Sequence, residues 1–290
     1  METPLELNQV FVDYEQPRNL HLNLYKPSRN SYCFTNVINY DILNQQIKEK
    51  INFLQTISFP FDKKCEIRTT QLTWMLKYDG ECEKEIIQKI LHDSNLVYLE
   101  INKIIFRNEF MEEKINNVLI KYNPLSFRQS DDSIKYKIYE ILQCSILGKQ
   151  THNMYLIGGE MIFYSKLFHS LNKIYMITDY ESIYEDAKRN STQNDIIKMI
   201  DYDKDELIQP EFIQNFTLIA NTSKQGLGKN LSKEILKLEI KTVFIVSCNS
   251  KSFYRDYEIL QRTSIYFLCI RPIHFFHVSK FIHFIYGTNV

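Results

Sequence analysis

Cys248 has the residue type and the position of a catalytic nucleophile. It ends the apolar run TVFIVSC, which predicts a buried strand, and a helical pattern follows within a few residues. A thiol between a strand tip and a helix N-terminus has a lowered pKa, because the positive end of the helix dipole stabilises the thiolate. The setting of Cys248 therefore predicts covalent catalysis, although an isolated cysteine at a strand end more often has a structural role.

Two glycines form a second candidate site. Gly158 and Gly159 end the apolar run MYLIGG, and a helical pattern begins at about Ile162. A glycine turn between a strand and a helix lets backbone N–H groups approach a ligand closely. The pair predicts a ligand-binding turn or, taken alone, an ordinary connection.

Both sites lie in a region where strands and helices alternate. Apolar runs predict strands at residues 154–158, 173–178, 216–221, 242–248, 264–270 and 280–287, with helices near 132–142, 162–170, 182–190, 232–238 and 252–260. This alternation is typical of an α/β fold with a mostly parallel sheet. Because no helix separates the last two strands, we expect them to form an antiparallel pair at the end of the sheet.

The chain of 290 residues is long enough for this domain and a smaller one before it. Residues 1–37 are polar and lack periodicity, which predicts an extended N-terminal arm. Residues 38–118 mix helical and strand patterns and predict a small α+β region. The α/β domain then covers residues 119–290.

Several segments of the third region resemble, in the same order, the motifs of the RNA uracil-5-methyltransferase family. They are NPLSFRQSDDS for S-F-x-Q-x-N, NMYLIGGEMIF for L-Y-C-G-x-G-x-F, YEDAKRN for D-A-K-R-N, IANTSKQGL for D-P-P-R-x-G-L, IVSCNS for S-C-N-P, and RPIHFFHVS for F-P-x-T-x-H-x-E. The resemblance implies a Rossmann-like class I methyltransferase domain with a mostly parallel, seven-strand sheet. It also implies S-adenosylmethionine as the cofactor and a tRNA or rRNA as the partner.

The resemblance assigns a role to several residues. In the family, the thiolate at the position of Cys248 adds to carbon 6 of uracil, which makes carbon 5 nucleophilic toward the cofactor's methyl group. Gly158, Gly159 and Phe163 fall in the cofactor turn. Asp179, after the next strand, would bind the cofactor ribose or, in a structural role, cap a helix.

Substrate roles and departures from the family also follow from the motifs. Gln129 and Phe127 would contact the substrate, and an amide such as that of Gln129 can pair with a pyrimidine edge through one donor and one acceptor. Asn221 and Lys224 replace the family's aspartate and arginine, and Ser279 stands at the position of the glutamate base. Because serine cannot accept a proton at neutral pH, the rate is expected to fall by about 10² to 10⁴.

The cofactor turn departs from the family as well. Met161 stands at a family glycine, and Glu160 precedes it. We expect both side chains to narrow the pocket, and we expect the Glu160 carboxylate to face no compensating positive charge.

Three functions are compatible with this pattern. The first is a catalytically degenerate member, a pseudoenzyme that acts as an RNA-binding or protein-binding subunit. The second is an active S-adenosylmethionine-dependent tRNA or rRNA uridine 5-methyltransferase, which the retained Cys248 and Gln129 favour. The third is a structural component of a ribonucleoprotein or virion assembly.

Composition narrows the partners and the compartment. Basic and acidic residues both number 35, so RNA affinity would have to come from a local patch. The six cysteines show no metal or iron–sulfur cluster spacing, and we expect neither group. We also expect an intracellular protein with no signal peptide, no transmembrane segment and no membrane partner, because no apolar run is long enough.

Overall fold

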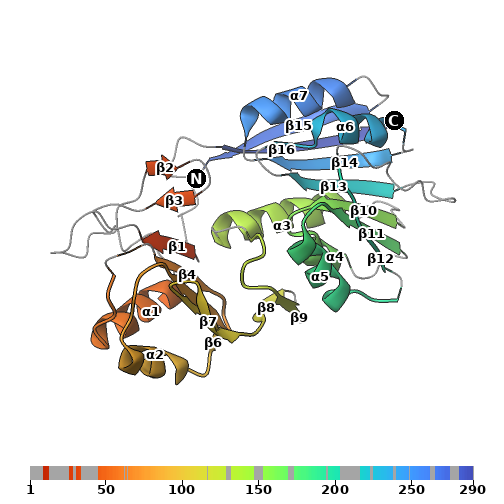
Figure 1. Cartoon of the computed structure of the whole chain (residues 1–290). Coiled ribbons are helices and arrows are strands. Elements are labelled where there is room, and N and C mark those ends of the chain that lie inside the picture. The colour runs from red at the N-terminus through yellow and green to blue at the C-terminus, as the bar shows by residue number, and fades with distance from the viewer. Residues whose placement is uncertain are drawn as a thin grey trace. The chain divides into compact units, whose positions relative to one another are not determined.

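The computed structural model describes residues 9–12, 26–28, 31–33, 45–61, 63, 65–115, 117–128, 132–146, 153–168, 173–193, 195–202, 216–222, 225–237, 240–247, 249–261, 265–274 and 281–289. Figure 1 shows the elements along the chain. The chain divides into a first unit, Met1–Leu125 with Gln129–Lys135, and a second unit, Ser126–Arg128 with Tyr136–Val290. Each unit is described by itself.

The first unit is an α+β structure around a five-stranded sheet. Its strand order is β1-β4-β5-β6-β7, with bounds Gln9–Val12, Cys65–Thr69, Trp74–Tyr78, Leu96–Ile101 and Ile104–Asn108. Only β5 and β6 are parallel. Two hairpins, β2 Lys26–Ser28 with β3 Ser31–Cys33 and β8 Met111–Ile115 with β9 Val118–Tyr122, complete its strands among the described residues.

Two amphipathic helices belong to the first unit. Helix α1 spans Gln45–Thr56 and α2 spans Lys84–Leu91. Each buries one apolar face at helical spacing, with the side chains of Ile47, Ile51 and Leu54 on α1 and Ile86, Ile87 and Ile90 on α2. This spacing is the reason that both segments fold as helices.

The second unit contains a mostly parallel sheet of seven strands. The order is β12-β11-β10-β13-β14-β16-β15, with bounds Asp195–Met199, Lys173–Thr178, Asn153–Gly158, Phe216–Thr222, Ile240–Ser247, Phe281–Asn289 and Ile265–His274. Strands β10 to β14 are parallel, whereas β16 is antiparallel to both β14 and β15. The predicted α/β fold class and the antiparallel final pair are confirmed. Strand β12 is an addition to the strands expected from the sequence.

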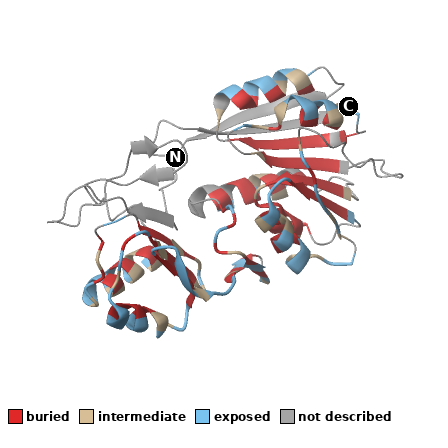
Figure 2. Cartoon of the chain, in the orientation of Figure 1, coloured by how far each residue is buried: buried red, intermediate tan, exposed pale blue. Residues whose placement is uncertain are grey.

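Helices connect these strands. They are α4 Met161–Leu167, α5 Glu181–Asn190, α6 Gly228–Leu236 and α7 Ser250–Leu260, whereas α3 Asp132–Ile146 precedes β10 and begins in the first unit. The central strands are buried on both faces, as Figure 2 shows for β10, β11, β13 and β14. Every second residue on these strands packs against α6 and α7, including Ile157, Leu218 and Ile245, with Leu231 and Phe253 from the helices. Continuous apolar runs are therefore required there.

Candidate active site

The C-terminal ends of the parallel strands lie at one edge of the second unit's sheet. Gly158 on β10 pairs with Asn221 on β13, and Thr222 pairs with Ser247 on β14. Asp179 directly follows β11 and is exposed. Open α/β sheets bind their ligands at this edge. The sequence-predicted positions Gly158, Gly159, Asp179 and Asn221 all lie there.

The glycine turn is pressed against strand β13. Gly158 has a φ of +84°, and a Cβ added there would overlap the carbonyl oxygen of Asn221. The Gly159 N–H donates to this same oxygen at 3.0 Å. Glycine is therefore required at residue 158, and the turn is fixed to the end of β13.

Glu160 completes this turn in a left-handed conformation, with φ 60° and ψ 9°. For a residue with a Cβ this conformation costs about 1 kcal/mol. Its side chain is fully buried, and its Oε1 accepts a hydrogen bond from Arg128 Nη1 at 2.5 Å. The expectation that Glu160 faces no positive charge is wrong, because Arg128, which is distant in sequence, supplies one.

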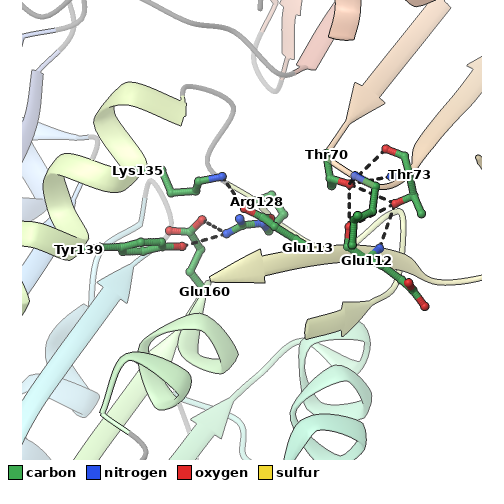
Figure 3. Close-up of polar contacts among 9 residues, drawn as sticks. Thr70, Thr73, Glu112, Glu113, Arg128, Lys135, Tyr139 and Glu160 are labelled. Atoms are coloured by element: carbon green, nitrogen blue, oxygen red, sulfur yellow. Dashed lines mark hydrogen bonds and ion pairs between the residues drawn. The ribbon is translucent and has the colours of Figure 1, made fainter. Parts of the chain in front are cut away.

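Arg128 is held by three groups of the second unit. Besides Glu160, its Nη1 donates to the Tyr139 hydroxyl at 3.1 Å, and its guanidinium carbon lies 3.4 Å from the centre of the Phe163 ring. Figure 3 shows the Arg128 and Tyr139 side chains pointing toward Glu160. Only 5% of the Arg128 side chain is exposed, so this is an ion pair in a low-dielectric interior.

Asn221 extends the buried network. Its Nδ2 donates to the Tyr164 hydroxyl at 2.9 Å and to Glu160 Oε2 at 3.4 Å. Burial and the negative charge of Glu160 raise the pKa of Tyr164 well above its usual value, so this hydroxyl is neutral. The Asn221 amide is therefore engaged in hydrogen bonds to two side chains of the protein itself.

Phe127 covers the outer side of the glycine turn. A Cβ added to Gly159 would lie 2.7 Å from the Phe127 ring, although 51% of Phe127 remains exposed. Its neighbour Ser126 donates to Asp186 Oδ2 on α5 at 2.5 Å. Two segments that carry family-like motifs, one at residue 126 and one at residue 186, are therefore in direct contact.

A second loop at this edge is held by helix α7. The buried Asp256 accepts a hydrogen bond from the Leu227 N–H at 2.6 Å and pairs with Arg255 Nη2 at 2.6 Å. Arg255 also donates to the Gln225 carbonyl oxygen at 2.7 Å. Burial raises the pKa of Asp256, although Arg255 and the backbone N–H groups oppose this shift. The start of helix α6 is thereby fixed in position.

Several sequence-predicted residues lie outside the described residues. These are Gln129, Lys224, Cys248 and Ser279. Sequence reasoning assigned no role to Arg128, Tyr139 or Tyr164. The Glu160 charge in the glycine turn was noted from the sequence, but no cation was inferred beside it.

The described residues contain neither a candidate metal cluster nor a candidate membrane helix. Within the described ranges, no group of three or more His, Cys, Asp or Glu side chains is placed to hold a metal ion. No helix in that part of the chain has the length and apolar character needed to cross a membrane.

Comparisons with known proteins point to one family. No protein-family profile matches the chain. It is 26% identical over 170 residues to the tRNA (uracil(54)-C(5))-methyltransferase of Pyrococcus horikoshii, an alignment that covers 58% of this chain and 40% of that protein. It is 25% identical over 161 residues to an uncharacterized RNA methyltransferase of Bacteroides thetaiotaomicron, covering 52% and 35%. The chain thus spans two fifths or less of the length of these relatives.

A solved structure shares the fold over nearly the whole chain. The Pyrococcus abyssi tRNA (uracil-54, C5)-methyltransferase in complex with S-adenosyl-L-homocysteine superposes with a TM-score of 0.67 at 14% identity. The match covers 99% of this chain and 77% of that one. The resemblance that the sequence motifs indicated is confirmed.

Proposed function

We propose that this chain, a divergent relative of the RNA uracil-5-methyltransferases, is a pseudoenzyme that binds RNA as a subunit of a larger assembly and transfers no methyl group. The observation that carries the proposal is the buried ion pair between Arg128 and Glu160 at the edge of the sheet where a cofactor would bind. Fold alone does not decide between catalysis and binding, so the argument rests on this site.

The residues at the glycine turn do not fit S-adenosylmethionine in this arrangement. The cofactor would lie against the backbone of residues 158–161, which align with the family's cofactor motif and of which Gly159 matches it while Met161 replaces a glycine. Phe127 occupies the space beside Gly159, and Arg128 covers the ring of Phe163. The contact between Arg128 and Phe163, together with the Glu160 side chain in the turn, supports the proposal that the methionine moiety is not bound there.

The polar groups that the reaction requires are also altered. Asn221 stands where the family has a carboxylate, and its amide is engaged with Tyr164 and Glu160. Ser279 stands at the position of the base that removes the proton from carbon 5. Parts that act as a unit in catalysis cannot be lost separately without loss of rate.

Exposed aromatic rings support the RNA-binding part of the proposal. Phe127, which packs against Gly159, and Tyr180, which follows β11, lie at the same sheet edge and are each 51% exposed. Proteins bind unpaired bases by stacking them on such rings, and each stacked base contributes about 1–3 kcal/mol.

Calorimetric titration with S-adenosylmethionine and fluorescence anisotropy with labelled tRNA test both halves. We expect no heat of cofactor binding, no tritium release from 5-³H-uridine in tRNA, and salt-dependent RNA binding. Phe127→Ala should lower RNA affinity by roughly 5- to 150-fold, as expected for one stacked base. Tyr254→Ala is the matched control, because Tyr254 is 48% exposed but lies on α7.

Two results would overturn the proposal. Micromolar cofactor binding or Cys248-dependent tritium release would establish the alternative, an active uridine 5-methyltransferase. Equal RNA affinity in the Phe127→Ala and Tyr254→Ala variants would show that the sheet edge with Phe127 and Tyr180 is not the RNA site.

A further inference from the structure

Strand β7 is the outer strand of the first unit's sheet and carries an unusual run of exposed apolar side chains. Ile104 is 60% exposed, Ile105 53% and Phe106 41%. Among the strands that the structure describes, only β6 pairs with β7, so its outer edge has no strand partner (Figure 1). Single exposed apolar residues are ordinary, but three in succession on a free edge mark an interaction surface or an aggregation hazard.

The charged residue within the strand does not protect this edge. Arg107 Nη1 donates to the backbone oxygens of Leu96 at 2.7 Å and Asp93 at 3.3 Å, so its guanidinium is turned back onto its own unit. The ladder with β6 also skips Phe106, which leaves that side chain without a cross-strand neighbour on β6.

We propose that the β7 edge binds the β7 edge of a second copy of this chain in antiparallel orientation, with the two-fold axis near Phe106. The argument for a second copy is charge self-complementarity. In this arrangement Lys103 of one copy lies opposite Glu109 of the other, and two-fold symmetry forms this pair twice. The Glu109 side chain is 63% exposed and its Oε1 lies 3.4 Å from Arg107 Nε of the same chain, which leaves its other side open to Lys103 of the second copy. Lys103 is exposed in the turn directly before the strand.

The local backbone suits this arrangement. Asn102 and Lys103 both have positive φ, at 46° and 66°, which gives a tight turn between β6 and β7. The Glu109 N–H donates to the Val97 carbonyl oxygen at 2.7 Å, so the chain stays alongside β6 beyond the end of β7. Lys103 and Glu109 are thus both held at the sheet edge.

The composition of the surface favours protein over RNA. Ile104 and Ile105 cannot stack bases, and the cations Lys103 and Arg107 are balanced by the nearby Glu109 and by Arg107's own backbone contacts. A contact through one strand edge is small, so we expect a reversible dimer with a dissociation constant in the micromolar range.

Sedimentation velocity of the full chain over a range of concentrations tests the proposal. The mass of wild-type protein should rise from the 34.7 kDa of one chain toward twice that value. Ile105→Lys should raise the dissociation constant at least tenfold. Leu119→Lys is the matched control, since Leu119 is a 41% exposed strand residue of the same unit on β9, and it should leave the dimer unchanged.

A charge exchange tests the orientation. Lys103→Glu and Glu109→Lys each place like charges opposite one another and should weaken the dimer, whereas the double variant should restore wild-type association. Circular dichroism confirms that each variant is folded. A wild-type protein that stays monomeric, a double variant that stays weaker than both singles, or an Ile105→Lys variant that loses RNA affinity with unchanged mass would refute the inference. Because cofactor binding plays no part here, its outcome leaves this test unaffected.

Discussion

Removing Arg128 alone from its buried pair with Glu160 should cost far more stability than removing both charges. Arg128→Met leaves a fully buried carboxylate without its cation, with the Asn221 amide 3.4 Å from Glu160 Oε2. Removal of one partner from a buried ion pair costs about 3–5 kcal/mol. In Arg128→Met/Glu160→Gln no charge stays buried, so we expect the double variant to be at least ~2 kcal/mol more stable than Arg128→Met alone.

Glu160→Gln should be the milder single change. The guanidinium left behind still contacts the Phe163 ring and the Tyr139 hydroxyl, and a glutamine oxygen still accepts its hydrogen bond. The order of stability is therefore expected to be wild type, then Glu160→Gln and the double variant, with Arg128→Met last.

Urea unfolding followed by circular dichroism measures these differences through the shift in midpoint at constant slope. Trp74 is the only tryptophan and is buried in the first unit, so its fluorescence reports on that unit while the substitutions lie in the second. An Arg128→Met variant whose free energy of unfolding lies within about 1 kcal/mol of wild type would refute the reasoning, because burying a carboxylate without its cation should cost more than that.

Three further outcomes are expected. Gly158→Ala should lower stability by at least ~2 kcal/mol, because the new Cβ would sit on a backbone with positive φ and would overlap the backbone of β13. Gly228→Ala, with φ +78° but open space around its Cβ, should lose only about 1 kcal/mol, and thermal melts compare the two. Burial alone would raise the pKa of Asp93, but the Lys50 ammonium at 2.7 Å and a backbone N–H hold this pKa below its usual value. The ionised Asp93 carboxylate therefore stabilises the folded state above about pH 4, and this stabilisation is lost as the pH falls further. Lys50→Met should thus destabilise the protein at pH 7 and have little effect at pH 2, as unfolding curves at the two pH values would show. Cys248→Ala should leave RNA affinity in anisotropy titrations unchanged, and a loss of affinity would contradict the pseudoenzyme proposal.

Apolar runs made the sheet of the second unit predictable. Strands such as 154–158 and 173–178 are buried on both faces, so their sequence has to be continuously apolar. Strand β12 escaped prediction because it lies at the sheet edge, where Asp195, Lys198 and the exposed Met199 are tolerated. The pairing of β1 with β4 depends on contacts across more than 50 residues, which local patterns do not carry.

The site was predictable where backbone geometry defines it and unpredictable where side chains meet across the fold. Gly158 and Asn221 could be placed at one edge because both end parallel strands. The ion pair between Arg128 and Glu160 joins residues 32 positions apart, and no periodicity relates them. The Glu160 charge was expected to have no compensating cation, and only the folded chain shows that Arg128 supplies one.

The energetics of this pair differ for its two members. A glutamate at residue 160 without Arg128 would add an uncompensated buried charge to a left-handed backbone that already costs about 1 kcal/mol. An arginine at residue 128 without Glu160 keeps its contacts with Phe163 and Tyr139, and its long side chain can extend toward solvent. If the two residues entered the sequence one at a time, the order that costs less stability is therefore the arginine first and the glutamate second. Once both are present, Arg128 cannot be removed alone without leaving a buried carboxylate that lacks its cation, so the stability of the fold retains the arginine.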